Sequence, residues 1–182
     1  MKMMSKKLLI NQLINFFWTI ISFAPVIIYA STVSNFWTIY FFIIVSILFG
    51  FLPTLVFKHI QLSRDPRFYE KLGVKKIRNF VQDGDIINRS IRKSLPHHRI
   101  TRNRHSVVKY LKTVEMYERY HFICLIFFSL IGVHAFLHLR YNLGILITAC
   151  NFLYNVCPIL LQQFNKARVW KIVKSNSRYL HE

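Results

Sequence analysis

Four apolar runs, each about as long as a bilayer core is thick, constrain this chain more than any other feature of its sequence. They cover residues 8–29, 36–57, 120–139 and 143–164. An α-helix needs about 20 mainly apolar residues to cross a hydrocarbon core of about 30 Å, and it satisfies its backbone hydrogen bonds within that segment. The runs therefore predict an all-α integral membrane protein with four transmembrane helices.

The first run follows a short lysine-containing segment, which is also how a secretory signal peptide begins. It is longer than the apolar core of a signal peptide, and no convincing small-residue cleavage site precedes the second run. We therefore expect a retained membrane helix, and a single membrane domain over residues 1–182.

Basic residues are distributed very unevenly around the runs. The chain has 25 Lys and Arg against 7 Asp and Glu. Residues 31–35, between the first two runs, contain no Lys or Arg, and the turn between the last two contains only Arg140, which leaves 24 of the 25 on the other side. Cytoplasmic loops of membrane proteins are enriched in Lys and Arg. This pattern predicts a multi-pass protein of the cell membrane, folded as two helical hairpins with both termini in the cytoplasm.

The segment between the hairpins, residues 58–119, holds 16 of the 25 basic residues, and a basic tail at 165–182 follows the fourth run. Apolar residues recur at 68–81 and 107–114, which predicts basic helices lying on the membrane face instead of a flexible linker. Anionic lipid head groups are the expected partners of this surface. No nucleic-acid partner is expected, because the chain has membrane spans and no recognisable nucleic-acid-binding motif.

Two ionisable residues lie where the third run begins, on the apolar face of its helix. At 100° per residue, Glu118 and His121 fall in the sector marked by Val107, Leu111 and Val114, and they are one helical turn apart. Burying a carboxylate is costly unless it is paired or functional. The two residues can act as a general base, with Glu118 orienting His121. A structural ion pair with a nearby Lys or Arg is the alternative.

Polar residues also accumulate in the fourth run and just after it. Asn151, Asn155 and Gln162 share one helical face, and Asn165 and Arg168 follow at the cytoplasmic end. Amides at such positions either bind a neighbouring helix or form a polar pocket that faces the central segment, and both interpretations stay open. We expect the carboxylate and imidazole of the third run to face this end of the fourth.

Neither a metal site nor a bound cofactor is indicated. His134 and His138 are four residues apart, which suits two metal ligands, but no third ligand accompanies them. The three cysteines lie in apolar runs without the C-x-x-C spacing of a metal or redox motif. We therefore expect no metal and no cofactor.

Three blocks of sequence occur in a specific order between about residue 67 and residue 173. YEKLGVKK spans 69–76 and continues to Asp83-Gly84, ERYH spans 118–121, and NVCPILLQQFNKAR spans 155–168. Together they resemble the glycosyl-4,4'-diaponeurosporenoate acyltransferases, small membrane enzymes of staphyloxanthin-type carotenoid synthesis. That family has an E-x-x-H at the head of its third span, and it has arginines where this chain has Gln163 and Lys166.

The resemblance implies an acyltransferase that moves a fatty acyl group from acyl-CoA or acyl carrier protein to a hydroxyl of a membrane lipid or glycolipid, such as a glycosylated carotenoid. It implies His121 and Glu118 as the catalytic residues, with the acyl carrier as a substrate. The substrate-binding residues that we expect from the other two blocks are Asn155, Gln162, Asn165, Arg168, Lys75, Lys76 and Asp83.

A non-catalytic interpretation uses the same charge pattern. A membrane scaffold or lipid-binding subunit would use the basic face to recruit an acidic partner. The inward-facing carboxylate and imidazole, together with the polar end of the fourth run, favour the enzyme over the scaffold.

The distribution of basic residues predicts that single cysteines placed at Ser34 and at Ser94 lie on opposite sides of the membrane. A membrane-impermeant thiol reagent added outside intact cells should label the first position, and should label the second only after the membrane is opened. Labelling of both positions from the same side would contradict the predicted topology.

Overall fold

The computed structural model describes residues 2–78 and 104–178, and all regular structure in that part of the chain is helical. This confirms the predicted all-α class for the described residues. In chain order the elements are α1 (Lys2–Ala30), α2 (Phe36–Gly50), α3 (Thr54–Ile60), α4 (Pro66–Lys71), α5 (Val74–Ile77), α7 (Arg104–Leu137), α8 (Tyr141–Asn151), a π-helical turn η1 (Phe152–Val156) and α9 (Cys157–Arg178).

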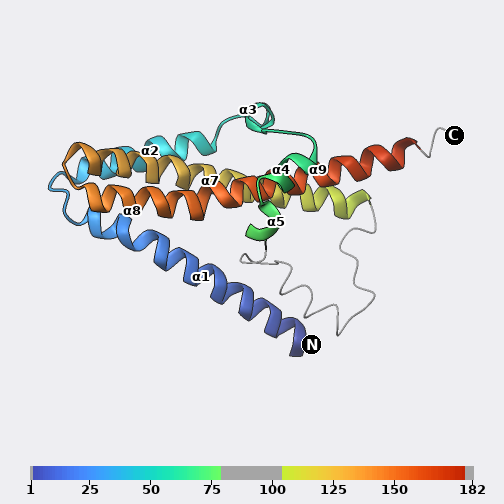
Figure 1. The fold of residues 1–182 in the computed structure, drawn as a ribbon, viewed down its shortest axis with the longest axis horizontal. Coiled ribbons are helices and arrows are strands. Elements are labelled where there is room, and N and C mark those ends of the chain that lie inside the picture. The colour runs from blue at the N-terminus through green and yellow to red at the C-terminus, as the bar shows by residue number, and fades with distance from the viewer. Residues whose placement is uncertain (1, 79–103, 179–182) are drawn as a thin grey trace.

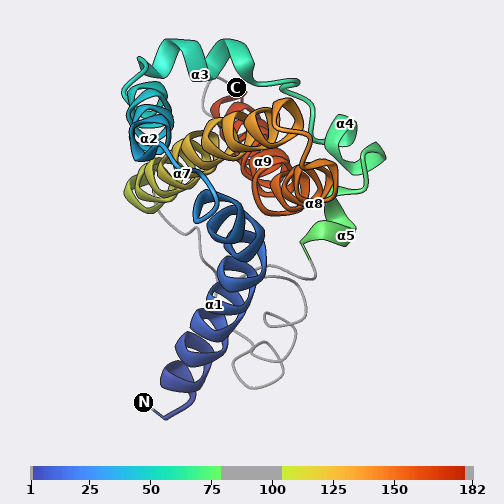
Figure 2. The ribbon, with the colours of Figure 1, turned by 90° about the vertical axis from the view of Figure 1, so that its left-hand side faces the viewer.

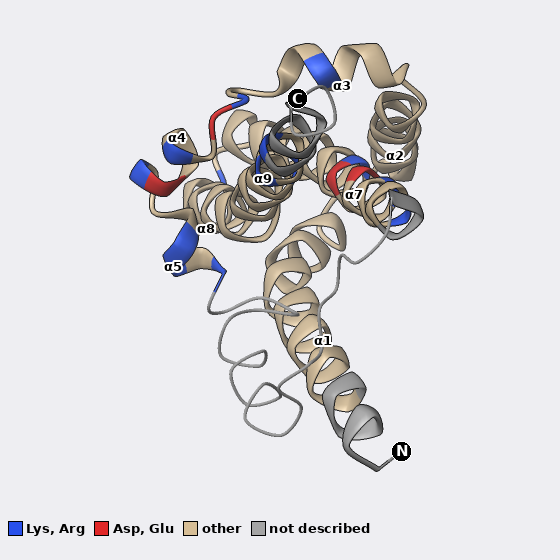
Figure 3. Ribbon diagram, turned by 90° about the vertical axis from the view of Figure 1, so that its right-hand side faces the viewer, with Lys and Arg blue, Asp and Glu red and all other residues tan. Residues whose placement is uncertain are grey.

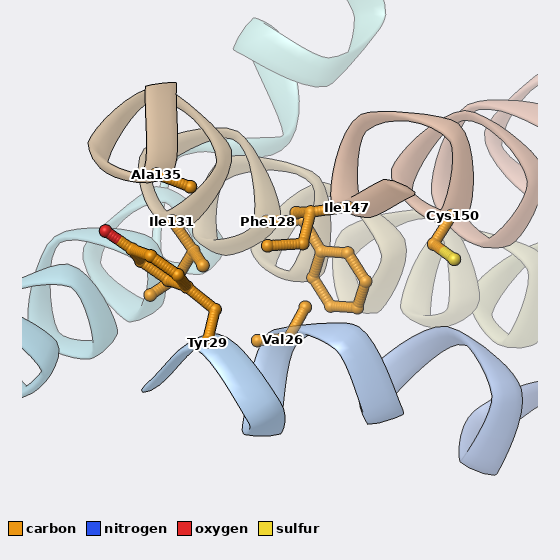
Figure 4. Packing of buried hydrophobic residues seen from close by; sticks show 7 residues of the cluster. All are labelled: Val26, Tyr29, Phe128, Ile131, Ala135, Ile147 and Cys150. Carbon is orange, nitrogen blue, oxygen red and sulfur yellow. The ribbon is translucent and has the colours of Figure 1, made fainter. Parts of the chain in front are cut away.

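The long helix α7 is the centre of the bundle. It packs against α2 on one side and against α8 and α9 on the other, and the C-terminal half of α1 closes the bundle at one end (Figures 1 and 2). The N-terminal half of α1 diverges from the other helices in both views. The apolar core lies at the end where α1 meets α7 and α8 (Figure 4), and its buried residues are Val26, Tyr29, Phe128, Ile131, Ala135, Ile147 and Cys150.

The outer surface of the bundle is apolar, as expected of a protein that faces lipid. Three helical stretches are long and apolar enough to cross a membrane, namely Leu9–Ala30, Val107–Leu137 and Tyr141–Lys171, and α2 with α3 forms a fourth, bent candidate. Large side chains stay exposed on these helices, with Phe16 at 66% and Trp37 at 79% of their full accessibility. Such a surface is stable only against lipid or another apolar partner, so the chain is a membrane protein.

The second run, expected to span residues 36–57, is divided into two helices in the structure. Helix α2 ends at Gly50, and α3 leaves it at an angle of 90°. The 15 residues of α2 rise only about 22 Å, less than the thickness of a bilayer core. Pro53 explains the break, because it has no N–H to continue the ladder and because proline disfavours helical geometry at the residue before it.

Arg119 of α7 binds the polar groups that this break leaves open. Its guanidinium donates hydrogen bonds to the carbonyls of Gly50 at 2.9 Å and Leu52 at 2.7 Å, and to the Thr54 hydroxyl at 3.0 Å. It also lies 4.4 Å from the ring centroid of Phe57. One side chain thus caps the C-terminus of α2 and anchors the start of α3.

The third run is part of a much longer helix than its apolar length of residues 120–139 suggests. Helix α7 has 34 residues and is about 51 Å long, so its basic N-terminal part extends well beyond a core of about 30 Å. The expected inward-facing stripe of the central segment and the third span therefore belong to one continuous helix.

The fourth run is also longer than the expected residues 143–164, and it contains a local change of helical pitch. Helix α8 passes into η1, where the Cys157 N–H donates to the Phe152 carbonyl five residues earlier, and then into α9. Pro158 has no N–H for the Tyr154 carbonyl, which accounts for the departure from α-helical bonding at this point. The basic tail expected at 165–182 is helical up to Arg178.

The described part of the central segment docks on α9. Gly73, with φ of 78°, ends α4 and starts α5, so the expected helix over 67–81 is broken in two. Its buried residues form a second apolar cluster with α9, made of Tyr69, Val74, Leu161, Phe164 and Ala167. The sequence also predicts a turn at Asp83-Gly84-Asp85 and an irregular, very basic stretch at 89–104. These residues lie outside the described part of the chain, except for Arg104, the first residue of α7.

Replacing Arg119 by Met should destabilise the fold, because three oxygen acceptors at the α2–α3 break lose their donor. Leaving such groups unsatisfied costs about 1–3 kcal/mol. We expect a lower midpoint of thermal unfolding in detergent for Arg119→Met, and an unchanged midpoint for Lys112→Met, which removes an exposed cation from the same helix. Equal midpoints for the two variants would contradict this role of Arg119.

Candidate active site at the basic end of the bundle

A buried ion pair joins α7 to α9 at the end of the bundle where basic residues gather (Figure 3). The Lys166 ammonium donates to Glu118 Oε2 at 2.5 Å, and the two side chains are only 6% and 1% exposed. A buried charge without a partner would cost several kcal/mol, so each residue depends on the other. The ion pair with a nearby Lys or Arg, the alternative left open by the sequence, is therefore present.

The second oxygen of the same carboxylate is buried and free. Glu118 Oε1 accepts no hydrogen bond from the described part of the chain. A carboxylate has about four acceptor sites, and a buried acceptor without a donor is unfavourable. This oxygen is therefore an unsatisfied buried acceptor in the described structure.

His121 lies one turn further along α7, and it binds α8–η1 instead of Glu118. Its Nδ1 is 3.4 Å from Asn155 Oδ1, and no hydrogen bond joins His121 to Glu118 in the described structure. Asn155 is completely buried, while the imidazole is half-buried. Glu118 and His121 therefore both face the fourth run, and among the described residues no hydrogen bond from Glu118 orients His121.

A chain of amides fixes the orientation of this imidazole. Asn155 Nδ2 donates to Asn151 Oδ1 at 2.8 Å, and Asn151 Nδ2 donates to the Ser129 hydroxyl at 3.0 Å and the Leu125 carbonyl at 3.2 Å. The amide oxygen of Asn155 is therefore directed at His121, whose Nδ1 must carry the proton. The Nε2 atom of the neutral ring then keeps its lone pair, as a general base requires.

Three hydroxyl groups form a row beside the imidazole. Tyr154 shares one hydrogen bond with Thr19 of α1 at 3.0 Å and another with Tyr120 of α7 at 3.1 Å. The rings of Tyr154 and His121 are in edge contact, with centroids 5.6 Å apart. The row connects α1, α7 and η1 at the level of His121.

The polar cluster continues toward the central segment through Gln163 and Tyr69. Gln163 is 1% exposed, and its Oε1 accepts from the Leu62 N–H and the Tyr69 hydroxyl, each at 3.2 Å. The same hydroxyl donates to the Ser63 carbonyl at 2.9 Å. Burial raises the pKa of Tyr69, which keeps the phenol protonated and able to donate. These bonds hold the segment before α4 against α9.

The other residues expected in the site lie further out. Gln162 and Asn165 are half-buried and bond to each other at 3.4 Å, and Arg168 is exposed, with its guanidinium 5.5 Å from the Phe164 ring centroid. Lys75 and Lys76 are exposed on α5, where Lys75 pairs with Glu70 at 3.0 Å. Asp83 lies outside the described residues.

Sequence reasoning missed Lys166 and Gln163 as members of the cluster. Lys166 follows Asn155 by eleven residues, about three helical turns, so it lies on the same face as the buried asparagines. A cation on the same helical face as buried amides indicates a buried partner for the carboxylate of Glu118. Both positions were noticed only as departures from an arginine pattern.

The two histidines at the opposite end of α7 contact each other and α1. The rings of His134 and His138 stack with centroids 4.1 Å apart, and His134 Nδ1 is 2.7 Å from the Tyr29 hydroxyl. Over the described residues, no group of three or more His, Cys, Asp or Glu side chains is arranged to hold a metal ion.

Comparison with known proteins identifies one related family. Residues 53–175 match the family model described as glycosyl-4,4'-diaponeurosporenoate acyltransferase. The matched stretch contains α3 to α8 and most of α9, with Glu118, His121, Asn155 and Lys166, and it confirms the resemblance seen in the sequence. No curated protein and no solved structure matches the chain significantly.

Breaking the buried ion pair should destabilise the protein strongly. We expect Lys166→Met to cost about 3–5 kcal/mol of unfolding free energy, because it leaves the Glu118 carboxylate buried without a cation. Removing both charges, in Glu118→Gln/Lys166→Met, should recover most of that loss. Denaturation in mild detergent measures both effects, with the exposed Lys171→Met of the same helix as the control. A double variant as unstable as the sum of the single variants would contradict the coupling.

Proposed function

The chain belongs to the glycosyl-4,4'-diaponeurosporenoate acyltransferase family and is a membrane acyltransferase of carotenoid synthesis. From that premise we propose that it moves a fatty acyl group from acyl-CoA or acyl carrier protein to a hydroxyl of a membrane glycolipid, such as a glycosylated carotenoid. The observation that carries the proposal is the half-buried imidazole of His121, whose Nδ1 is turned toward Asn155 by a chain of buried amides.

In the proposed reaction, His121 acts as the general base. Its Nε2 takes the proton from the acceptor hydroxyl as the hydroxyl oxygen attacks the thioester carbonyl carbon. The carbon–sulfur bond then breaks, and the imidazolium returns the proton to the leaving thiolate. The products are an ester and a free thiol, so atoms and electrons balance without an oxidant or reductant.

Direct transfer is favoured over an acyl-enzyme intermediate. Cys124, Cys150 and Cys157 are the cysteines of the chain, and all three are buried. A reactive thiolate needs a cationic or otherwise stabilising environment and access to the substrate. The apolar surroundings of Cys150, in the core between α1, α7 and α8, supply neither.

Two substrates of opposite character would reach this site from different directions. The acceptor lipid lies in the bilayer, beside the apolar surfaces of α1 and α7. The acyl carrier is polar and anionic, and the exposed Lys75 and Lys76 of α5, with Arg168 of α9, lie at the basic end of the bundle. We propose that these cations attract the carrier, and that Gln162 and Asn165 bind the sugar or the developing oxyanion. Asp83 belongs to the same proposed binding surface.

We further propose that the basic end of the bundle faces the cytoplasm. Both termini and the central segment would then lie on that side, where anionic lipid head groups neutralise the excess of Lys and Arg. Of the bent pair, only α2 would enter the membrane, and it is too short to cross the whole core. Helix α3 would then lie along the head-group region on the cytoplasmic side.

Replacing His121 by Ala should lower the acyl-transfer rate by roughly 10²–10⁴-fold, as expected for a lost general base, while the protein still folds. Lipid profiles of cells that express the chain should contain an acylated glycolipid that is absent without it and strongly reduced with His121→Ala.

His138→Ala is the matched control, because that imidazole lies just beyond the opposite end of α7, where its Nδ1 is 2.9 Å from the His134 carbonyl oxygen. An unchanged lipid profile on expression of the intact chain would contradict the proposed acceptor class. An active His121→Ala variant would contradict the proposed base.

A further inference from the structure

We propose that Glu118 Oε1 accepts a hydrogen bond from an amide N–H of the pantetheine arm of the acyl donor, and that Lys166 is the residue that positions this carboxylate. The inference rests on the proposed acyl transfer and assigns to Glu118 a role that differs from orienting His121. It names the part of the donor that is common to acyl-CoA and acyl carrier protein.

The free carboxylate oxygen is the observation behind this assignment. Glu118 is 1% exposed, and Oε1 is a buried side-chain oxygen without a hydrogen-bond partner in the described structure. Leaving such an acceptor unsatisfied is unfavourable, and a ligand N–H or O–H at this point would remove the penalty. We therefore expect a ligand that binds here to present a hydrogen-bond donor to Oε1.

The position of Glu118 favours the acyl donor over the acceptor lipid. Glu118 is one turn closer than His121 to the basic N-terminal end of α7, and it lies beside α9 and the segment held by Tyr69 and Gln163. A polar carrier would approach from that end, whereas an acceptor lipid would approach from the apolar side. A thioester arm that extends from this end toward His121 passes Glu118 first.

The spacing along the helix also fits the arm. Three residues separate Glu118 from His121, which is about 4.5 Å along the helix axis. In a pantetheine thioester the nearest amide nitrogen is joined to the sulfur through two methylene groups, which places it about 5 Å from the thioester carbonyl carbon when the arm is extended. An amide bound at Glu118 would therefore place the thioester carbonyl near His121.

Lys166 makes this geometry possible. By binding Oε2 at 2.5 Å, Lys166 holds the carboxylate in place, and Oε1 stays without a partner among the described residues. Hydrogen bonds to ionised acceptors are about twice as strong as those between neutral groups. Because Oε1 is buried, the side chains around it must move apart before the pantetheine arm can reach it.

The test compares two probes that differ only in the N–H group. One is a long-chain thioether of N-acetylcysteamine, and the other is its oxygen analogue, in which an ester replaces the amide. Binding of each to the full chain in nanodiscs is measured by equilibrium dialysis, with empty nanodiscs to subtract partitioning into lipid. We expect the amide probe to bind about tenfold or more tightly than the ester probe, as a hydrogen bond to a charged group implies.

The variants separate this role from a purely structural one. In Glu118→Met/Lys166→Met, which removes both buried charges together, the ratio of the two affinities should fall to about one. In Lys166→Arg, which keeps a cation, the preference for the amide should remain. A structural ion pair would change stability and leave the ratio as it was.

Equal binding of the two probes by the wild-type chain would overturn the inference, as would no binding of either or an unchanged ratio in a folded double variant. Failure of the double variant to fold leaves the wild-type ratio as the deciding measurement. Because these probes cannot transfer an acyl group, their binding is independent of the lipid profile that tests the proposed function.

Discussion

The burial of one ion pair between two helices organises the functional end of this protein. Glu118 and Lys166 meet where water is excluded, so that neither charge is tolerated without the other. Their contact fixes how α7 lies against α9. With the helices aligned in this way, His121 on the next turn of α7 lies beside the side-chain oxygen of Asn155. The amide nitrogen of Asn155 donates to Asn151. The orientation of the imidazole is therefore a consequence of a charge pairing one turn away.

The same requirement for polar partners explains the irregular parts of the helices. In a membrane, backbone groups released from a helix must find donors or acceptors within the protein. At the end of α2 the released carbonyls bind Arg119, and the change of pitch at η1 lies directly beside His121. Both irregularities therefore face α7, one at Arg119 and the other at His121. Helix α7, which carries the catalytic candidates, therefore also supplies the donor for the carbonyls released at the end of α2.

This arrangement suits a reaction between a polar carrier and a lipid. The basic end of the bundle gathers cations on α4, α5 and α9, while the surfaces of α1 and α2 are apolar (Figure 3). The imidazole lies between these two regions, half-buried beside a row of hydroxyl groups. The bonds from Gln163 to Tyr69 and Leu62 attach the basic central segment to the same cluster. Membership of an acyltransferase family gives this geometry its chemical context.

The sequence by itself determined the helical class, the apolar runs, the one-sided distribution of charge and the inward face of α7, because these follow from composition and a period of 3.6 residues. It also placed Glu118, His121 and Asn155 in one polar region. Tertiary structure alone decided which groups pair: Glu118 with Lys166 instead of His121, and Arg119 with the broken end of α2. Periodicity fixes the face on which a side chain lies, but the choice among several partners on the facing helix depends on the axial offset between the helices, and packing sets that offset.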